Sequence, residues 1–199
     1  MNSLELIGRD ALVVVAHPDD ETIWMGGTIL KFPNVRWTIL SLSRSDYKDR
    51  APKFKRVARL YQARGIISDL EDEGIMNIAA SVPEIEWRIM RGLRRRRFDY
   101  LFTHGYTGEY GHPRHKGVHR AVARLLRARR LATKHFFTFA YHPGSSGKLA
   151  LPDRHANYRV TLTRKIFNAK RDVIHKLYGF RTNSFEYRSA HPKETFNGK

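Results

Sequence analysis

A continuous apolar run near the amino terminus is the feature that most constrains how this chain can fold. Residues 11–16 read ALVVVA and are rich in β-branched side chains, which is typical of a strand covered on both faces within a parallel sheet. Similar runs recur along the chain, and stretches with the apolar spacing of amphipathic helices lie between them. Further strands are predicted at residues 35–42, 66–70, 100–103, 134–141 and 158–162, and helices at residues 21–31, 52–64, 83–96, 115–131 and 164–178.

The alternation of strands and helices predicts an α/β protein with a Rossmann-like, mostly parallel sheet and helices on both faces, because parallel neighbours need crossover connections. With 199 residues, 41% of them hydrophobic, the chain is expected to form a single domain, residues 1–199. Residues 142–153 are rich in Gly, Ser and Pro and are predicted to form a loop. The tail after about residue 180 is predicted to be irregular, with residues 197–199 frayed.

Composition narrows the chemistry that the chain can use. The absence of cysteine excludes disulfides, thiolate-bound zinc and cysteine nucleophiles, and it agrees with a cytoplasmic protein. Because the longest apolar run is far too short to span a bilayer, we expect neither a signal peptide nor a membrane anchor. The net charge of +18 attracts anions, which leaves nucleic acid, an anionic small-molecule substrate and a merely solvated surface as alternatives.

Histidines and acids gather in the turns that follow the predicted strands, at the edge where open α/β sheets bind ligands. The sequence His17-Pro18-Asp19-Asp20-Glu21 follows the first strand and enters a helix. Because adjacent carboxylates cannot point the same way, one of them can bind a cation together with His17 while the other faces whatever the cation binds. A helix cap would explain the three acids, but it would not explain His17-Pro18.

A second cluster of histidines leads into the basic helix predicted at residues 115–131. His112 and His115 lie three residues apart, and either could complete a site with three protein ligands and one position for water. His119 competes because it lies on the same helical face as His115, although a surface position is the simpler interpretation. His104 and His142 also follow strands, and each could join a site or bond to loop backbone.

Taken together, AHPDDE at residues 16–21 and GHPRH at residues 111–115 resemble the LmbE-like or PIG-L family of zinc-dependent N-acetylglucosaminyl deacetylases. The resemblance extends to IWMGG at residues 23–27, DRAPKF at residues 49–54 and YGF at residues 178–180, and so spans most of the chain. It implies a hydrolase that uses metal-activated water to remove an N-acyl group, expected to be acetyl, from an amino sugar or sugar conjugate. A related amidase acting on a non-sugar N-acyl substrate is the first alternative.

Carried over position by position, the resemblance implies that His17, Asp20 and His115 bind the metal and that Asp19 is the general base. The expected metal is Zn²⁺, although two imidazoles and one carboxylate also suit Fe²⁺. Either Asp19 or a cationic His112 could return a proton to the leaving amine.

His112 and Tyr110 match the oxyanion-stabilising positions of the family. The chain departs from the common pattern at Arg114, where many members have Asp. Arg114 would point away from His112, disfavour its imidazolium form, or bind an anionic part of the substrate. Arg50, Asp72 and Arg114 are the candidate substrate-binding residues.

Arginine is concentrated in two of the predicted helical segments. Residues 94–97 form a run of four arginines at the end of one helix, and Arg120, Arg124 and Arg127 share one face of another. A solvated surface explains both, because cations are favoured at a helix C-terminus and on an exposed helical face. A phosphate-binding surface is the alternative, and with it a nucleic-acid-binding protein whose metal site is not catalytic.

Overall fold

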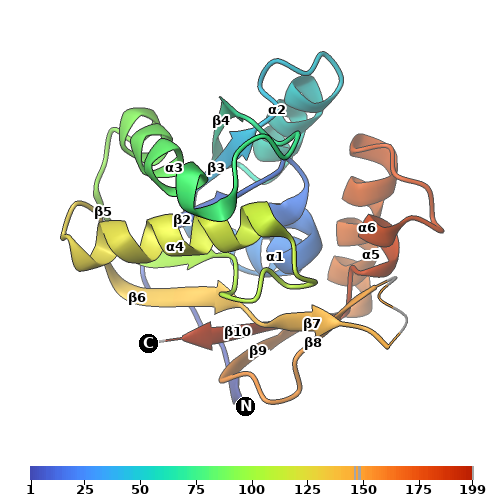
Figure 1. Cartoon of the computed structure of the whole chain (residues 1–199). Helices are drawn as coiled ribbons and strands as arrows, with labels where there is room; N and C mark the ends of the chain where they lie inside the picture. Colours follow the sequence, from blue (N-terminus) through green and yellow to red (C-terminus); the bar gives the residue numbers. More distant parts are fainter. Residues whose placement is uncertain (146, 148, 199) are drawn as a thin grey trace.

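The computed structural model describes residues 1–145, 147 and 149–198. It confirms the α/β fold class, with a mostly parallel central sheet and helices on both of its faces (Figure 1). The large sheet contains β1 (Asn2–Ser3), β2 (Asp10–Val15), β3 (Arg36–Ser43), β4 (Arg64–Leu70), β5 (Arg97–Thr103), β6 (Ala132–Phe139), β9 (Tyr158–Thr161) and β10 (Lys193–Gly198), and β7 (Tyr141–Pro143) pairs with β8 (Ala150–Pro152). The helices are α1 (Asp20–Lys31), α2 (Arg50–Leu60), α3 (Ile78–Gly92), α4 (Pro113–Arg127), α5 (Arg164–Asp172), the π-helix η1 (Val173–Leu177) and α6 (Phe185–Arg188).

The order of the parallel strands creates one obvious ligand site. Five parallel strands run in the order β6-β5-β2-β3-β4. The chain adds β3 and β4 on one side of β2 and then returns to add β5 and β6 on the other side. Such a reversal leaves a crevice at the carboxyl ends of β2 and β5, which is where open α/β sheets bind ligands.

Successive side chains of β2 point alternately into the two hydrophobic cores on either face of the sheet. Val13 and Val15 pack with side chains of α1, α2 and η1, whereas Leu12 and Val14 pack with side chains of α3 and α4. All four are fully buried. The continuous apolar run at residues 11–16 is therefore explained by helices that cover both faces of the central strand.

The predicted strands and helices are present, although their ends shift. Helix α3 begins at Ile78 rather than at Pro83, because the Asn77 side chain caps it by accepting a hydrogen bond from the Ala80 N–H at 2.9 Å. The loop predicted at residues 142–153 contains the short β7–β8 pair, and residues 146 and 148 lie outside the described part of the chain. None of the described helices combines the length and the hydropathy that crossing a membrane requires.

The prediction of an irregular tail after residue 180 is wrong. Helix α6 forms there, and β10 inserts as an antiparallel strand between β6 and β9. Phe196 and Glu194 of β10 are both fully buried, so packing against the rest of the sheet outweighs the polar local sequence. Asn197 and Gly198 belong to β10 rather than to a frayed end, and Lys199 lies outside the described residues.

Glu194 ties this last strand to a break in the first helix. At Met25 the backbone of α1 leaves the helical conformation, with φ −148° and ψ 15°, so the next amides need partners from elsewhere. The Glu194 carboxylate accepts hydrogen bonds from the Gly27 and Thr28 amides at 2.9 and 2.6 Å. It also pairs with the fully buried Lys170 ammonium at 2.6 Å. One carboxylate therefore joins α1, α5 and β10.

Replacing Glu194 with alanine should lower the free energy of unfolding by about 3–5 kcal/mol, because the substitution leaves a buried ammonium without its counter-charge. Chemical denaturation of Glu194→Ala measures this change. Glu5→Ala, which removes an exposed carboxylate, is the matched control and should stay within about 0.5 kcal/mol of the parent. A loss below about 1 kcal/mol for Glu194→Ala would show that the pair is not a structural anchor.

Candidate functional site

The turn after β2 places three polar side chains at the carboxyl edge of the sheet. His17, Asp19 and Asp20 are all buried. Asp19 adopts φ 149°, a conformation that costs an L residue about 1–3 kcal/mol. Its amide donates a hydrogen bond of 3.1 Å to Glu21, whose carboxylate also accepts one from the Tyr178 hydroxyl at 2.7 Å. Glu21 therefore holds the strained turn in place.

Asp20 is oriented through both of its carboxylate oxygens. The indole N–H of Trp24 donates to Oδ1 at 2.9 Å, and the backbone N–H of His17 donates to Oδ2 at 2.9 Å. Burial would raise the pKa of Asp20, but the charges of His115 and His104 hold it well below its usual range. Asp20 is therefore ionised, and its Oδ2 faces the rings of His17 and His115.

The segment between β5 and α4 brings a buried carboxylate against two histidines. Glu109 Oε2 lies 2.8 Å from Nδ1 of His104 and 2.5 Å from Nδ1 of His115, and all three residues are fully buried. Burial would raise the pKa of Glu109, but the two histidines lower it to about 2. An ionised carboxylate accepts hydrogen bonds, so Glu109 keeps a proton on Nδ1 of His115 and leaves Nε2 as the nitrogen that faces Asp20 and His17. Although these three residues could also surround a cation, their donors are already bonded to one another.

Three donor atoms from the segments after β2 and β5 converge at this edge. His17 Nδ1, Asp20 Oδ2 and His115 Nε2 are separated from one another by 3.2, 3.4 and 3.4 Å. Ligands at the usual 2.0–2.1 Å from a tetrahedral zinc ion lie about 3.3 Å apart, so this donor triangle fits Zn²⁺ as it stands. A set of three protein ligands is typical of catalytic rather than structural zinc sites. The arrangement therefore permits a metal site built from two segments that are distant in the sequence.

Asp19 lines the same hollow as His17 and Asp20. Its side chain makes no capping hydrogen bond to α1, so a helix cap does not explain it. Instead, Oδ2 accepts a hydrogen bond from the Arg50 guanidinium at 3.1 Å. Burial, and after it the charge of Asp20, raises the pKa of Asp19 well above its usual range. Such a carboxylate can both accept and return a proton.

His112 also lines the hollow and caps α4. Its Nδ1 accepts a hydrogen bond from the Arg114 amide at 3.2 Å, which requires a lone pair and places the ring proton on Nε2. Burial, followed by the charges of His115 and His17, lowers the pKa of His112 to about 3. Tyr110 lines the same hollow, and burial raises the pKa of its phenol. Both side chains are therefore neutral groups with a proton to donate.

Arg114 turns away from the hollow. Its side chain is buried and donates a hydrogen bond of 3.0 Å to Glu71. The guanidinium is therefore directed to Glu71, and Arg114 is not among the residues that line the hollow. An arginine therefore replaces the more usual acid without placing a cation in the hollow.

Asp72 contacts His17 but is not among the residues that line the hollow. Its carboxylate is 2.9 Å from the Arg44 guanidinium and 2.9 Å from His17 Nε2, which it approaches at ion-pair distance but without hydrogen-bond geometry. Asp72 also forms a second possible donor group with His17 and His112, but its carboxylate is already paired with Arg44. Of the three candidate substrate-binding residues, only Arg50 lines the hollow.

The other histidines stand apart from the donor triangle. The half-buried His119 donates from Nδ1 to the His104 carbonyl at 2.9 Å, so it supports the loop after β5. The exposed His142 bonds to the carbonyl of its neighbour Pro143. His104, in contrast, belongs to the site through Glu109.

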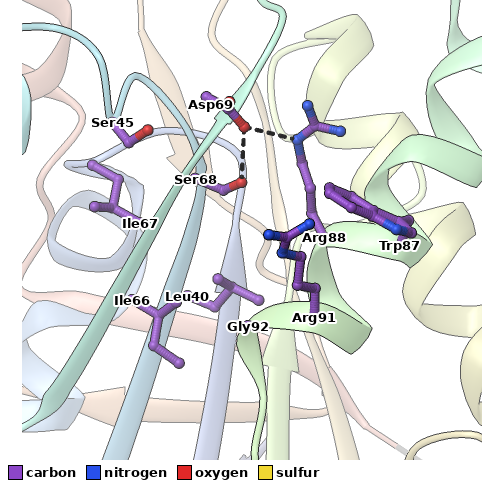
Figure 2. Close-up of a pocket in the computed structure, with 10 residues that line it drawn as sticks. All are labelled: Leu40, Ser45, Ile66, Ile67, Ser68, Asp69, Trp87, Arg88, Arg91 and Gly92. Carbon is purple, nitrogen blue, oxygen red and sulfur yellow. Dashed lines mark hydrogen bonds and ion pairs between the residues drawn. The ribbon is translucent and has the colours of Figure 1, made fainter.

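The hollow above the donor triangle is small, with a volume of about 120 Å³, and Phe185 and Glu186 of α6 contribute to its wall. A larger hollow of about 510 Å³ lies between β4 and α3 (Figure 2). The described residues that line this second hollow include no histidine. The carboxylate of Asp69 in its wall already accepts hydrogen bonds from the Ser68 hydroxyl and the Arg88 guanidinium. The smaller hollow is therefore the one that carries histidines and carboxylates able to take part in catalysis.

A family model described as PIG-L, GlcNAc-PI de-N-acetylase, matches residues 12–126 of the chain. The chain belongs to the PIG-L family. An uncharacterized protein of Acanthamoeba polyphaga mimivirus is 25% identical over 125 residues, which cover 55% of this chain and 54% of that protein. The match thus spans about half of the relative's length.

Solved structures share the fold at low sequence identity. A conserved protein of Thermus thermophilus matches with a TM-score of 0.70 and 18% identity, covering 95% of this chain and 94% of that one. The N,N'-diacetylchitobiose deacetylase of Pyrococcus horikoshii matches with a TM-score of 0.69 and 15% identity over 97% and 84% of the two chains. The 4-carboxy-2-hydroxymuconate hydratase of Pseudomonas putida also matches, with a TM-score of 0.61 and 15% identity over 91% and 83%. The fold is thus shared by more than one chemistry, and the reaction must be argued from the site.

Several residues of the site were not predicted from the sequence. Glu109 has no spacing that marks it, because its partners His104 and His115 meet it only after β5 and α4 are packed. Arg44 directly follows β3, a position that could have identified it. Trp24 lies four residues after Asp20 in α1, the spacing at which two side chains share a helical face.

Replacing Glu109 with glutamine should weaken Zn²⁺ binding by about 10- to 100-fold, because the carboxylate that orients His115 loses its charge. Competition with a chromogenic chelator measures the affinity. Glu84→Gln, at an exposed position of α3, should bind Zn²⁺ like the parent protein. Equal affinity in the parent and in Glu109→Gln would contradict the orienting role.

Proposed function

We propose that this chain is a metal-dependent N-deacetylase that removes an acetyl group from an amino sugar or a sugar conjugate. The observation that carries the proposal is the donor triangle of His17, Asp20 and His115, with Asp19 and His112 around one hollow beside it. Membership of a family described as a de-N-acetylase supports the reaction class. The Pyrococcus horikoshii protein with a similar fold is named as a deacetylase of N,N'-diacetylchitobiose, which supports a sugar substrate.

His17, Asp20 and His115 would hold the metal ion, for which Zn²⁺ is the first choice and Fe²⁺ the second. When bound, such a divalent cation lowers the pKa of water and polarises a carbonyl group. The protein contributes the rest of the arrangement. Trp24 and Glu109 hold Asp20 and His115 in the orientation that binding requires.

Asp19 acts as the general base that takes a proton from the attacking water. Its position in the wall of the hollow and its lack of a capping role leave the carboxylate available. Arg50 limits the movement of the carboxylate through a hydrogen bond of 3.1 Å. Once protonated, Asp19 is the acid that returns the proton to the departing nitrogen, because the ring of His112 is neutral and its Nδ1 already accepts a hydrogen bond.

His112 stabilises the oxyanion that forms on the acyl carbon. Its Nδ1 is held by the Arg114 amide, which leaves the Nε2–H as the donor. The Tyr110 hydroxyl is a second donor in the same wall. Loss of one such donor typically costs about 3–4 kcal/mol of transition-state stabilisation.

The size of the hollow favours a short acyl group. Sites that enclose whole drug-sized ligands have volumes of about 300–1,000 Å³, whereas this hollow has about 120 Å³. It can take the acyl end of a substrate while the sugar remains at its mouth. Arg44 and Arg50 in its wall suit a substrate that carries an anionic group.

The test is a screen of N-acetylated amino sugars, with and without an anionic aglycone, for amine release by the zinc-loaded protein. Asp19→Asn should lower kcat by about 10²- to 10⁴-fold because it removes the base, while its zinc content stays that of the parent. Asp49→Asn, at an exposed position before α2, should keep full activity. Release from N-acetylated amino acids but from none of the sugars would replace the sugar assignment with the amidase alternative, and no release from either would refute the enzyme.

Lengthening the acyl chain should reduce turnover. The rate on one amino sugar should fall progressively from N-acetyl to N-propionyl to N-butyryl, because a hollow of about 120 Å³ does not accommodate longer chains. Steady-state kinetics on the three substrates measures this preference. A rate that rises with chain length would contradict an acetyl-sized site.

A further inference from the structure

The amino ends of the parallel strands carry a concentration of cations that the proposed reaction does not use. The sheet order brings the residues before and at the start of β2, β3, β4, β5 and β6 to one edge, together with the end of α4 (Figure 1). We call this set the amino-edge surface, and its exposed cations are Arg9, Arg36, Arg64, Arg94, Arg95, Arg97, Arg127, Arg129, Arg130 and Lys134.

Few acids offset this charge. The described acids that pair with the amino-edge surface are Asp10, Asp99 and Glu86. Ten cations therefore face three acids at one edge of the sheet. A cation at the end of one helix is explained by the helix dipole, but arginines at the first residues of β3, β4 and β5 are not.

The amino-edge surface is hollowed where α4 passes into β6. This cleft has a volume of about 490 Å³ and is lined by five cations and by no acid among the described residues. Its cations are Arg96, Arg97, Arg129, Arg130 and Lys134, and its apolar lining includes Leu126 and Phe136.

The cations of the cleft differ in how far they are already neutralised. Arg96 donates to the carbonyls of Leu93 and Met90, and so closes the end of α3. Lys134 pairs with Asp99 at 2.8 Å, whereas Arg130 lies 3.9 Å from Glu86.

Arg97 and Arg129 are the least neutralised cations of the cleft. Both are exposed and have no acid within 4 Å in the described part of the chain. Because their neighbours are cations too, their charges repel one another until an anion binds between them.

We propose that the cleft and the surrounding amino-edge surface bind the phosphate backbone of a nucleic acid strand, without reading its bases. Nine of the ten exposed cations are arginines, and the guanidinium fork binds phosphate oxygens in pairs and stacks on bases. The cations converge on a recess, which an extended strand can enter and a flat bilayer surface cannot. Phe136 and Leu126 give the recess an apolar wall against which a base can pack.

This binding surface is separate from the proposed active site. The donor triangle lies at the carboxyl ends of β2 and β5, and the amino-edge surface lies at the opposite ends of the same strands. Changes to the cleft should therefore alter nucleic acid binding and leave amine release unchanged. The two proposals fail independently, because each has its own readout.

The experiment measures fluorescence anisotropy of a labelled oligouridylate of about 20 nucleotides, long enough for one strand-binding site, over a series of salt concentrations. The triple variant Arg97→Ala, Arg129→Ala, Arg130→Ala should weaken binding at least tenfold. It should also reduce the slope of log K against log salt by about 2, since each phosphate contact on a single strand contributes about 0.7. The triple variant Arg159→Ala, Arg164→Ala, Lys165→Ala removes the same charge from exposed positions elsewhere and should leave the slope unchanged.

Arg129→Gly is a second variant, chosen because it should fold normally. Arg129 has φ 55°, a backbone conformation that glycine adopts without strain. It should reduce the slope by about 0.7. Equal losses in the two triple variants would show a diffuse field rather than a site and would overturn the proposal. Unchanged binding in the cleft variants would overturn it as well, as would binding to phosphatidylserine vesicles without binding to the oligonucleotide.

Discussion

Strands β2 and β5 lie side by side at the point where the chain reverses the direction in which it adds strands. Because both strands run the same way, the turn after one and the loop after the other meet at a single edge. His17 and Asp20 come from the first and His115 from the second, and their donor atoms lie 3.2–3.4 Å apart. Neither segment could form the triangle alone. The site therefore depends on the parallel pairing of these two strands before it depends on any ligand.

Much of this arrangement can be predicted from the sequence, because it follows from local patterns. The alternation of apolar runs and helical spacing predicts the parallel sheet, and burial of β2 on both faces explains why its six residues show no period of two. The position of the histidines and acids after strands predicts which edge carries the site. The backbone strain at Asp19 is not visible in the sequence, since it is maintained by Glu21 and, through it, by Tyr178 from the far end of the chain.

The features that could not be predicted are those that arise only between distant segments. Strand β10 has a polar sequence, KETFNG, and its place in the sheet depends on Phe196 entering the core and on Glu194 meeting the break in α1. Glu109 is an ordinary loop acid until packing places it against two buried rings. In both cases a buried carboxylate is stabilised by donors from several elements, and no spacing within one segment records that.

The burial of these acids also changes how the net charge should be understood. The sequence has 37 lysines and arginines and 19 acids. Among the residues that the structure describes, however, the acids Asp19, Asp20, Glu21, Glu109 and Glu194 are buried, against the cations Arg114 and Lys170. Folding therefore buries more acids than cations, so the net charge of the solvent-exposed side chains is more positive than the formal +18 of the whole chain. Withdrawal is also uneven, because four of the five buried acids lie at the carboxyl edge around the donor triangle. The same folding that gathers carboxylates at one end of the sheet therefore leaves few acids to pair with the arginines at the other end.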